Sequence, residues 1–249
     1  MNVGIFGLGV VGSALANYLT KTTKHKIMRV DPRLNLNDDI SNCVAVFMCV
    51  PVPTIETTWE QDFSILESCM EKTEKDQIVF IRSTVLPSTC DRLSKKFDRN
   101  VISLPEFLTQ RYADFDMETI DICSGAKNDA NAQEVLTDLF PNKQIKHFLN
   151  LECELGKFYN NVNGATSVHI SSIMYQMACQ YGVSYENVLM AGNTPKYLGQ
   201  RYRSQPGHDG LPGFGGECFP KDLKSFAMLT KLESLKHIVI ENDFLRSKS

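Results

Sequence analysis

Short apolar runs alternate with amphipathic stretches along residues 1–149. The run at residues 43–50 is apolar at nearly every position, which is typical of a strand covered on both faces. Strands are predicted at residues 2–6, 26–30, 43–50, 77–81, 101–104, 120–123 and 145–148. Residues 62–72 have the apolar spacing of a helix, and further helices are predicted at residues 13–19, 87–96 and 131–140. This alternation predicts an α/β fold with a mainly parallel sheet and helices on both faces.

The pattern changes near residue 150, where a long stretch without proline begins. Residues 151–181 carry apolar or bulky side chains at spacings of three and four, which predicts a long amphipathic helix: Leu155, Phe158, Val162, Ala165, His169, Ile173, Met177 and Tyr181. We interpret His169 as a packed core histidine. Shorter helices are predicted at residues 185–191, 223–232 and 235–245. We therefore expect an α/β domain at residues 1–149 and an all-helical domain at residues 150–249.

Three glycines follow the first predicted strand and precede the first predicted helix: Gly7, Gly9 and Gly12, with Val10 and Val11 between the last two. Strand, G-x-G-x-x-G and helix together are the context of the dinucleotide-binding turn in a Rossmann-type, doubly wound sheet. The first glycine permits the tight turn and the second lets a pyrophosphate approach the backbone. The third allows close packing of helix on strand. The sequence therefore predicts a dinucleotide cofactor.

The second predicted strand is followed at once by Asp31. An acidic residue about 20 positions after the glycines binds the ribose 2′-hydroxyl and repels a 2′-phosphate. We therefore expect NAD as the cofactor. Arg33 lies nearby and leaves NADP as the alternative.

A second glycine cluster occurs at residues 213–222, which read Gly-Phe-Gly-Gly-Glu-Cys-Phe-Pro-Lys-Asp. Pro220 suits the first turn of a helix, so Cys218 is expected near a helix N-terminus, where the dipole favours a thiolate. Asp222 lies about one turn further on and is expected to face the same pocket. We refer to residues 213–218 as the cysteine loop.

Composition narrows the possible partners. The net charge of −3 provides no basic surface for nucleic acid, and no apolar run is long enough to span a membrane. The eight cysteines form no C-x-x-C pair, which argues against a metal site and for a reducing, cytoplasmic location. The N-terminus has no basic leader, so no signal peptide is expected.

The segment at residues 213–222 resembles the catalytic loop of the UDP-glucose/GDP-mannose dehydrogenase family, Gly-Phe-Gly-Gly-x-Cys-Phe-x-Lys-Asp. Other segments are also similar to that family: Pro51-Val52-Pro53-Thr54, Ser83-Thr84-Val85, Pro105-Glu106-Phe107-Leu108 and Glu154-x-x-Lys157-x-x-x-Asn161. The resemblance implies oxidation of a sugar 6-hydroxyl to a carboxylate, with two NAD and a cysteine-bound thioester. It also implies that the long helix forms a homodimer interface.

The resemblance assigns roles to individual residues. The catalytic set is Cys218 as nucleophile, Lys157 and Asn161 beside the oxyanions, and Thr84, Glu106 and Asp222 around the hydrolytic water. The expected cofactor residues are Gly7, Gly9, Val10, Val11, Gly12, Asp31, Val50, Pro51 and Thr84. The expected substrate residues are Glu106, Phe107, Leu108, Lys157, Asn161, Phe214, Gly215 and Gly216. The resemblance further implies that the substrate is a UDP- or GDP-sugar.

The sequence departs from the family pattern at several points. Val52 replaces a threonine, Ser88 a glycine and Gln110 a glutamate, and Thr119 is nearest to an expected arginine. Lys196, Arg201 and Arg203 compete for the role of a substrate-binding arginine. We expect a short member without the family's third, UDP-binding domain. The alternatives are a hydroxy-acid dehydrogenase that transfers a single hydride and does not need Cys218, and a non-catalytic NAD-binding dimer.

Overall fold

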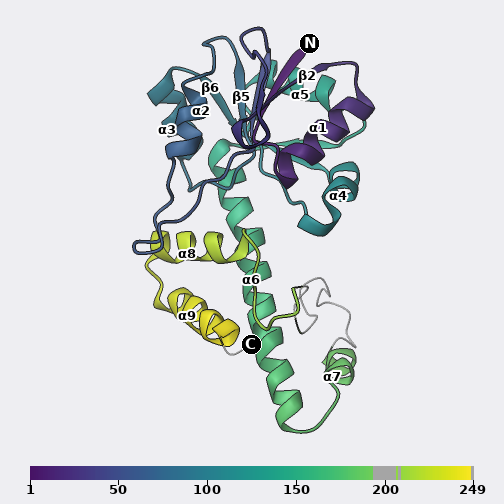
Figure 1. Ribbon diagram of the computed structural model, residues 1–249, viewed down its shortest axis with the longest axis vertical. Coiled ribbons are helices and arrows are strands. Elements are labelled where there is room, and N and C mark those ends of the chain that lie inside the picture. The colour runs from purple at the N-terminus through teal and green to yellow at the C-terminus, as the bar shows by residue number, and fades with distance from the viewer. Residues whose placement is uncertain (193–205, 207–208, 248–249) are drawn as a thin grey trace. The chain divides into compact units, whose positions relative to one another are not determined.

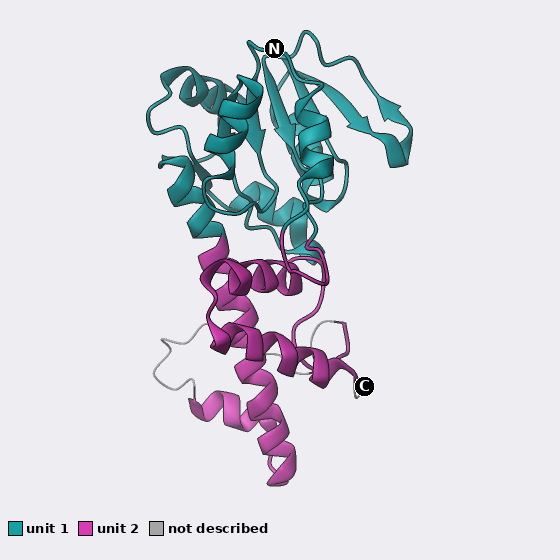
Figure 2. Cartoon of the chain, turned by 90° about the vertical axis from the view of Figure 1, so that its left-hand side faces the viewer, with its two compact units in different colours: residues 1–53, 61–157 teal, residues 54–60, 158–249 magenta. Residues whose placement is uncertain are grey.

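A computed structural model of the chain describes residues 1–192, 206 and 209–247. They form two compact units, which are coloured separately in Figure 2. Unit 1 consists of Met1–Pro53 and Gln61–Lys157, and unit 2 of Thr54–Glu60 and Phe158–Ser249. The linear pattern predicts a boundary at residue 149. The units instead divide within the long helix, and residues 54–60 group with the second unit.

A six-stranded sheet forms the centre of unit 1, in the order β3-β2-β1-β4-β5-β6 (Figure 1). Its strands are β1 (Asn2–Phe6), β2 (Lys26–Asp31), β3 (Leu36–Asn37), β4 (Ala45–Met48), β5 (Ile78–Ile81) and β6 (Asn100–Ser103). Every neighbouring pair is parallel except β2 and β3. The mainly parallel sheet is thus confirmed. The carboxyl ends of β1, β4, β5 and β6 consequently lie along one edge, where such sheets bind their ligands.

Helices cover both faces of this sheet, as predicted. Ala45 and Phe47 of β4 belong to a core on one face, shared with α1 (Val10–Thr22) and α5 (Ala130–Leu139). Val46 and Met48 belong to a core on the other face, shared with α2 (Ser64–Met70) and α3 (Thr89–Phe97). All four residues of β4 are 0% exposed, which explains why this strand has no polar position. The doubly wound architecture thus follows from apolar strands that need cover on both faces.

Two parts of unit 1 differ from the expectation. The predicted strands near residues 120 and 145 are β7 (Ile122–Ser124) and β8 (Ile145–His147), and they form a separate two-stranded sheet. A helix that the pattern does not predict, α4 (Ala113–Thr119), packs against α1. Only Met117 of α4 is buried, and Phe115 is 65% exposed, so the segment lacks a helical apolar stripe. Two short 3₁₀ helices, Pro32–Leu34 and Gln110–Tyr112, complete the unit.

The described part of unit 2 is helical. It contains most of α6 (Asn150–Gln180), together with α7 (Tyr185–Gly192), α8 (Phe219–Thr230) and α9 (Glu233–Ser247). The ends of α6 lie within one residue of the predicted ends. A small core forms from α6, the cysteine loop, α8 and α9, with one buried residue from each: Ala165, Phe214, Leu223 and Val239. His169 is buried, as predicted, and its Nε2 lies 2.9 Å from Glu241 Oε2.

Candidate active site

The glycine turn after β1 has the geometry that a dinucleotide requires. Gly7 has φ +81°, and a Cβ there would lie 2.6 Å from the Cys49 carbonyl oxygen. A Cβ on Gly12 would overlap the carbonyl oxygen of Gly7. A Cβ on Gly9, in contrast, would meet nothing within 4 Å. Two glycines are therefore required by the protein's own packing, whereas Gly9 leaves open space at the N-terminus of α1, where a pyrophosphate binds.

Asp31 lies at the carboxyl end of β2 and contacts the same turn. Its Oδ2 accepts a hydrogen bond from the backbone N of Leu8 at 2.8 Å, and Arg33 Nη2 donates to it at 3.1 Å. The Arg33 side chain is the largest cause of a lowered pKa at Asp31, which keeps the carboxylate ionised. An ionised carboxylate beside the glycine turn suits a ribose hydroxyl. The residues present thus fit a nicotinamide dinucleotide.

The loops after β4 and β5 are tied to each other by polar contacts. Ser83 Oγ donates to the carbonyl oxygen of Val50 at 2.5 Å. Gln61, which is buried, donates from Nε2 to the carbonyl oxygen of Thr84 and accepts from the backbone N of Leu86. Thr84 is 8% exposed. Ser83 and Gln61 thereby fix the backbone around two of the expected cofactor residues.

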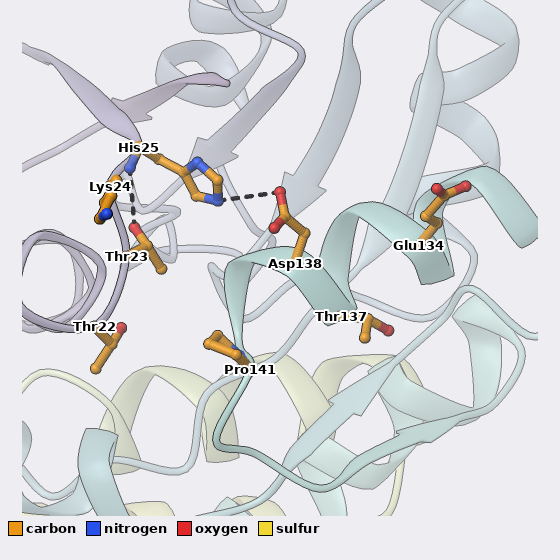
Figure 3. Close-up of a pocket in the computed structure, with 8 residues that line it drawn as sticks. All are labelled: Thr22, Thr23, Lys24, His25, Glu134, Thr137, Asp138 and Pro141. Atoms are coloured by element: carbon orange, nitrogen blue, oxygen red, sulfur yellow. Dashed lines mark hydrogen bonds and ion pairs between the residues drawn. The ribbon is translucent and has the colours of Figure 1, made fainter.

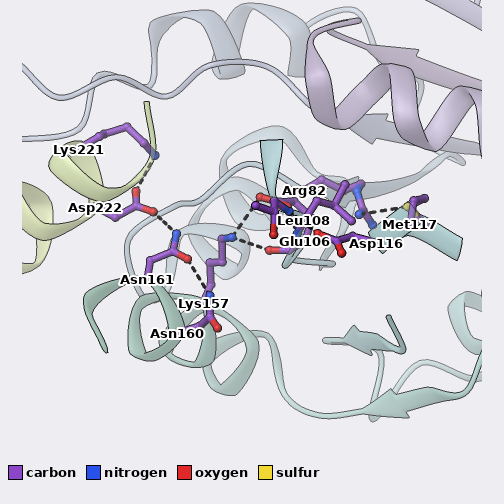
Figure 4. A network of polar contacts seen from close by, with 11 residues as sticks. Arg82, Glu106, Leu108, Asp116, Met117, Lys157, Asn160, Asn161, Lys221 and Asp222 are labelled. Carbon is purple, nitrogen blue, oxygen red and sulfur yellow. Dashed lines mark hydrogen bonds and ion pairs between the residues drawn. The ribbon is translucent and has the colours of Figure 1, made fainter. Parts of the chain in front are cut away.

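Lys157 and Glu106 form a buried ion pair in unit 1 (Figure 4). Lys157 Nζ lies 3.1 Å from Glu106 Oε1 and donates to the Glu106 carbonyl oxygen at 2.5 Å. The other carboxylate oxygen accepts from the backbone N of Leu108, and the ammonium lies 5.3 Å from the centre of the Phe107 ring. The lysine is 4% exposed and the glutamate 7%. The structure thus brings the expected Lys157 together with the whole expected segment Glu106–Leu108.

Arg82 is a second buried cation in unit 1 that the sequence pattern does not identify. It follows β5, is 4% exposed, and points its Nη2 at the sulfur of Met117 from 3.9 Å (Figure 4). Its Nε is buried without a hydrogen-bond partner. Burial is the largest cause of its lowered pKa, and electrostatic interactions with Cys49 and Glu106 oppose that effect. Arg82 therefore adds positive potential near the buried Glu106.

The Glu154 carboxylate binds backbone N–H groups at the start of α3, within unit 1. Its two carboxylate oxygens accept from the backbone N of Ser88 at 2.6 Å and of Cys90 at 2.8 Å. These donors belong to the first turn of α3, whose N-cap Ser88 has φ +70° and makes no side-chain cap. Burial raises the pKa of Glu154 despite both donors. The first residue of the Glu-x-x-Lys segment therefore anchors α6 to α3.

The residues around Cys218 form a second polar group, which lies in unit 2. Cys218 is the exposed N-cap of α8, and Pro220 lies in the first turn of that helix, as expected. Asp222 is fully buried and accepts from Asn161 Nδ2 at 2.5 Å (Figure 4). Lys221 Nζ lies 2.7 Å from its other oxygen. The structure thus pairs the expected Asn161 and Asp222 and adds Lys221 to them.

The other cysteines differ from Cys218 in their surroundings. None of the cysteines in the described residues forms a disulfide. Burial raises the pKa of the Cys49 thiol to about 12 and that of the Cys43 thiol to about 11. Cys179 is exposed, but it lies near the C-terminal end of α6, where the helix dipole disfavours a thiolate. Among the described residues, Cys218 is the exposed cysteine that lies at a helix N-terminus, which is a position that favours a nucleophilic thiolate.

A separate hollow in unit 1 contains none of the expected site residues. It is an open groove between the end of α1 and α5, lined by Thr22, Thr23, Lys24, His25, Glu134, Thr137, Asp138 and Pro141 (Figure 3). His25 Nε2 lies 3.1 Å from Asp138 Oδ2 across it. In the part of the chain that the structure describes, no group of three or more His, Cys, Asp or Glu side chains is placed to hold a metal ion. Among the same residues, no helix is both long and apolar enough to cross a membrane.

The remaining expected residues have varied positions. Val50 is buried and Pro51 exposed after β4, and Val10 is 43% exposed at the start of α1. Phe214 is buried in the core of unit 2, and Gly216 has φ +77°. The three candidates for the substrate-binding cation, Lys196, Arg201 and Arg203, lie outside the described residues.

Comparison with family models gives two adjacent matches. Residues 32–144 match the NAD binding domain of the UDP-glucose/GDP-mannose dehydrogenase family, and residues 151–242 match its central domain. The first match begins after Asp31 and does not include the glycine turn. The assignment of that turn therefore rests on the glycine geometry described above.

Curated relatives carry related names. The chain is 26% identical over 266 residues to a UDP-glucose 6-dehydrogenase of Rickettsia bellii, covering 97% of this chain and 55% of that protein. It is 28% identical over 201 residues to the UDP-glucose 6-dehydrogenase of Rickettsia felis, covering 75% of this chain and 44% of that protein. The chain thus spans about half the length of these relatives.

Among solved structures, a UDP-glucose dehydrogenase from the hyperthermophilic archaeon Pyrobaculum islandicum has the same fold. The TM-score is 0.81 at 21% sequence identity, over 98% of this chain and 68% of that one.

Proposed function

Because the chain belongs to the UDP-glucose/GDP-mannose dehydrogenase family, we propose that it oxidises the 6-hydroxyl of a nucleotide sugar to a carboxylate, with NAD as oxidant and Cys218 as nucleophile. The observation that carries this proposal is the position of Cys218. It is an exposed thiol at the N-terminus of α8, four residues before a buried Asp222 that accepts from Asn161. A hydride transfer alone would need neither feature.

The NAD-binding residues are those of the turn and strand ends. The N-terminus of α1 beside Gly9 would hold the pyrophosphate, and Asp31 the adenosine ribose. The loops that begin at Val50 and Thr84 follow β4 and β5 at the ligand-binding edge of the sheet. When bound, NAD supplies the hydride acceptor, and two equivalents are consumed for each alcohol taken to the acid.

Lys157 and Asn161 stabilise negative charge on the reacting oxygen. A buried ammonium is strongly favourable beside a developing oxyanion, because little water screens it. The contact of Lys157 with Glu106 keeps that ammonium oriented while the carboxylate is available to exchange a proton with substrate or water. Asn161 donates from its side-chain amide, which its contact with Asp222 orients.

Cys218 retains the substrate between the two oxidations. Its thiolate adds to the aldehyde carbon, forming a C–S bond and a hemithioacetal oxygen that takes up a proton. Loss of the second hydride and of that proton leaves a thioester. Water then attacks the thioester carbon, the C–S bond breaks, and the carboxylate and the thiol are released. The resemblance to the family assigns Thr84, Glu106 and Asp222 to the positioning and deprotonation of this water.

We also propose that the protein forms a homodimer through α6. We further propose that it works in a reducing, cytoplasmic environment. The helix leaves large apolar side chains exposed along its length, and the residue directly after it is exposed as well: Leu151, Leu155, Tyr159, Ile170, Ile173, Met174 and Met177, followed by Tyr181. An apolar surface of this extent on a single helix is typical of a protein interface. A reducing compartment would keep Cys218 in the thiol form that the reaction needs.

The test is NADH production with a panel of UDP- and GDP-sugars, using wild type, Cys218→Ser and Lys157→Met. Cys218→Ser is expected to bind NAD normally and to lose acid formation by several orders of magnitude, because serine is a far weaker nucleophile at neutral pH. Lys157→Met is expected to lose about 10²- to 10³-fold in turnover, as for removal of one oxyanion donor. Cys179→Ser, at another exposed cysteine of unit 2, is the matched control and keeps full activity.

Two outcomes contradict the thioester mechanism. If Cys218→Ser retains turnover while Lys157→Met does not, the protein transfers a single hydride without covalent catalysis. If wild type binds NAD and no panel member yields NADH, the non-catalytic alternative holds.

A further inference from the structure

Asn242 is a buried polar residue in the interior of α9. It is 1% exposed, in a helix whose other buried residue is Val239. Asparagine is a poor helix former, and a buried amide is costly unless it is hydrogen-bonded. A residue that opposes both helix formation and apolar packing indicates a requirement outside its own helix.

The Asn242 side chain binds the backbone of the cysteine loop from two sides. Its Oδ1 accepts from the backbone N of Phe214 at 2.7 Å, and its Nδ2 donates to the Phe214 carbonyl oxygen at 3.0 Å. The amide therefore pairs with a single residue as a neighbouring strand would, and both of its polar atoms are satisfied. The two bonds fix the position and the orientation of one peptide segment.

The residue before Phe214 is adapted to this contact. Gly213 has φ +78°, and a Cβ there would overlap Asn242 Oδ1. Its backbone N donates to Ser172 Oγ of α6 at 3.1 Å. The start of the cysteine loop is thus held by one side chain from α6 and one from α9.

The other end of the loop is anchored by α8. The backbone N of Asp222 donates to the Cys218 carbonyl oxygen, which begins the helix, and the Asp222 side chain accepts from Asn161. Only Gly215, Gly216 and Glu217 lie between Phe214 and Cys218. Glycines have more conformational freedom than other residues, so a fixed point at Phe214 strongly restricts where the cysteine lies.

We infer that Asn242 is a positioning residue, which acts through the Phe214 backbone to hold Cys218 at the N-terminus of α8. This inference rests on the proposed function only for the role of Cys218 as nucleophile. The placement of the thiol can be measured without a nucleotide sugar. The positioning role of Asn242 and the proposed function can therefore be refuted independently of each other.

The test compares the alkylation rate of Cys218 by iodoacetamide with that of Cys179, by peptide mass spectrometry of the full chain. Asn242→Leu removes both hydrogen bonds while keeping the number and branching of the side-chain heavy atoms. The ratio of the two rates is expected to fall at least about threefold at neutral pH, since a thiol that leaves the helix N-terminus has less thiolate. Asp243→Asn, at the exposed neighbouring position of α9, leaves the ratio unchanged.

Asn242→Asp is a second variant that keeps one of the two hydrogen bonds. Its carboxylate still accepts from the Phe214 N–H but cannot donate to the carbonyl, so an intermediate rate ratio is expected. Hydrogen exchange of the Phe214 amide should accelerate roughly tenfold in Asn242→Leu and much less in Asn242→Asp, because a neutral hydrogen bond changes such an equilibrium by a modest factor. A rate ratio equal to wild type in both variants would overturn the inference, whether or not exchange accelerates, because Asn242 would then serve only the core.

Discussion

The Asp31 carboxylate interacts with two groups of its own chain, the Leu8 amide and the Arg33 guanidinium. The amide contact couples the acid to the glycine turn, so the group that would select the ribose also holds the loop that would receive the pyrophosphate. The guanidinium is bound to Asp31 in this arrangement. A 2′-phosphate would have to displace that pair and would also meet the carboxylate charge.

Asp31→Ala is predicted to weaken NAD binding by about 10- to 100-fold, the effect of losing a hydrogen bond to a charged group. The preference for NAD over NADP should decrease in the same variant, because the repelling charge is gone. Titration with NADH and NADPH by fluorescence measures both effects. Equal NAD affinity in wild type and Asp31→Ala would show that the ribose does not bind there.

The pH dependence at Asp31 follows from its lowered pKa. A depressed carboxyl pKa stabilises the folded state above the ordinary aspartate pKa, and that contribution is lost as pH falls through the depressed value. The Asp31 contribution to NAD affinity should therefore be constant from about pH 5 upward and decline only in more acidic solution. Titrations of wild type at several pH values check this, with Asp31→Ala as the pH-independent control.

Site residues whose role depends on nearby residues in the sequence could be predicted from the sequence. The turn at Gly7 and the start of α8 at Cys218 are local structures with local patterns. Gln61 and Asn242 could not be predicted, because each binds the backbone of a segment far along the chain. Gln61 contacts a residue 23 positions away, and Asn242 one that is 28 positions away. The burial that makes Asn242 unusual within a helix is visible only in the structure.

At the scale of elements, α6 and α3 are connected by one carboxylate. The N-cap of α3 does not cap its own helix, and Glu154 accepts from two of its first backbone N–H groups instead. Such groups have no partner within the helix and are costly when buried. The same four-residue segment therefore fixes the helix and presents Lys157 one turn later.

Glu154→Ala is predicted to destabilise unit 1 by about 1–3 kcal/mol, since two buried donors lose their acceptor. Hydrogen exchange at Ser88 and Cys90 should accelerate, and the urea midpoint of the chain should fall. Glu134→Ala, at an exposed position of α5, is the matched control within about 0.5 kcal/mol of wild type. A wild-type midpoint in Glu154→Ala would refute the capping role.

At the scale of the whole molecule, we propose that the apolar positions of α6 exposed among the described residues form a dimer interface. Light scattering is predicted to give about twice the chain mass of 28.0 kDa. Ile170→Glu, which places a charge at a position 60% exposed in the single chain, should yield monomers. Phe115→Glu, at a position of α4 that is 65% exposed, should remain dimeric. A wild-type monomer at micromolar concentration would contradict the proposed interface.

The division into two units could be predicted only in part from the order of the elements along the sequence. The pattern change near residue 150 marks the start of α6, but residues 54–60 group with unit 2 although they lie between β4 and α2. Residues 54–60 belong to unit 2 because of their side-chain contacts. Trp59 packs against the small core of unit 2, and Lys224 Nζ lies 3.0 Å from Glu56 Oε2. No periodicity within so short a segment could reveal either contact.

The position of Trp59 has an optical consequence. It is the single tryptophan of the chain, and it is partly buried against the core of unit 2, which includes the cysteine loop's Phe214. Intrinsic fluorescence excited at the red edge of protein absorption therefore reports on the helical unit, although the fluorophore belongs to the first quarter of the sequence. An unfolding curve recorded by that emission follows the surroundings of Phe214, and the sheet that holds the glycine turn is spectroscopically silent in it.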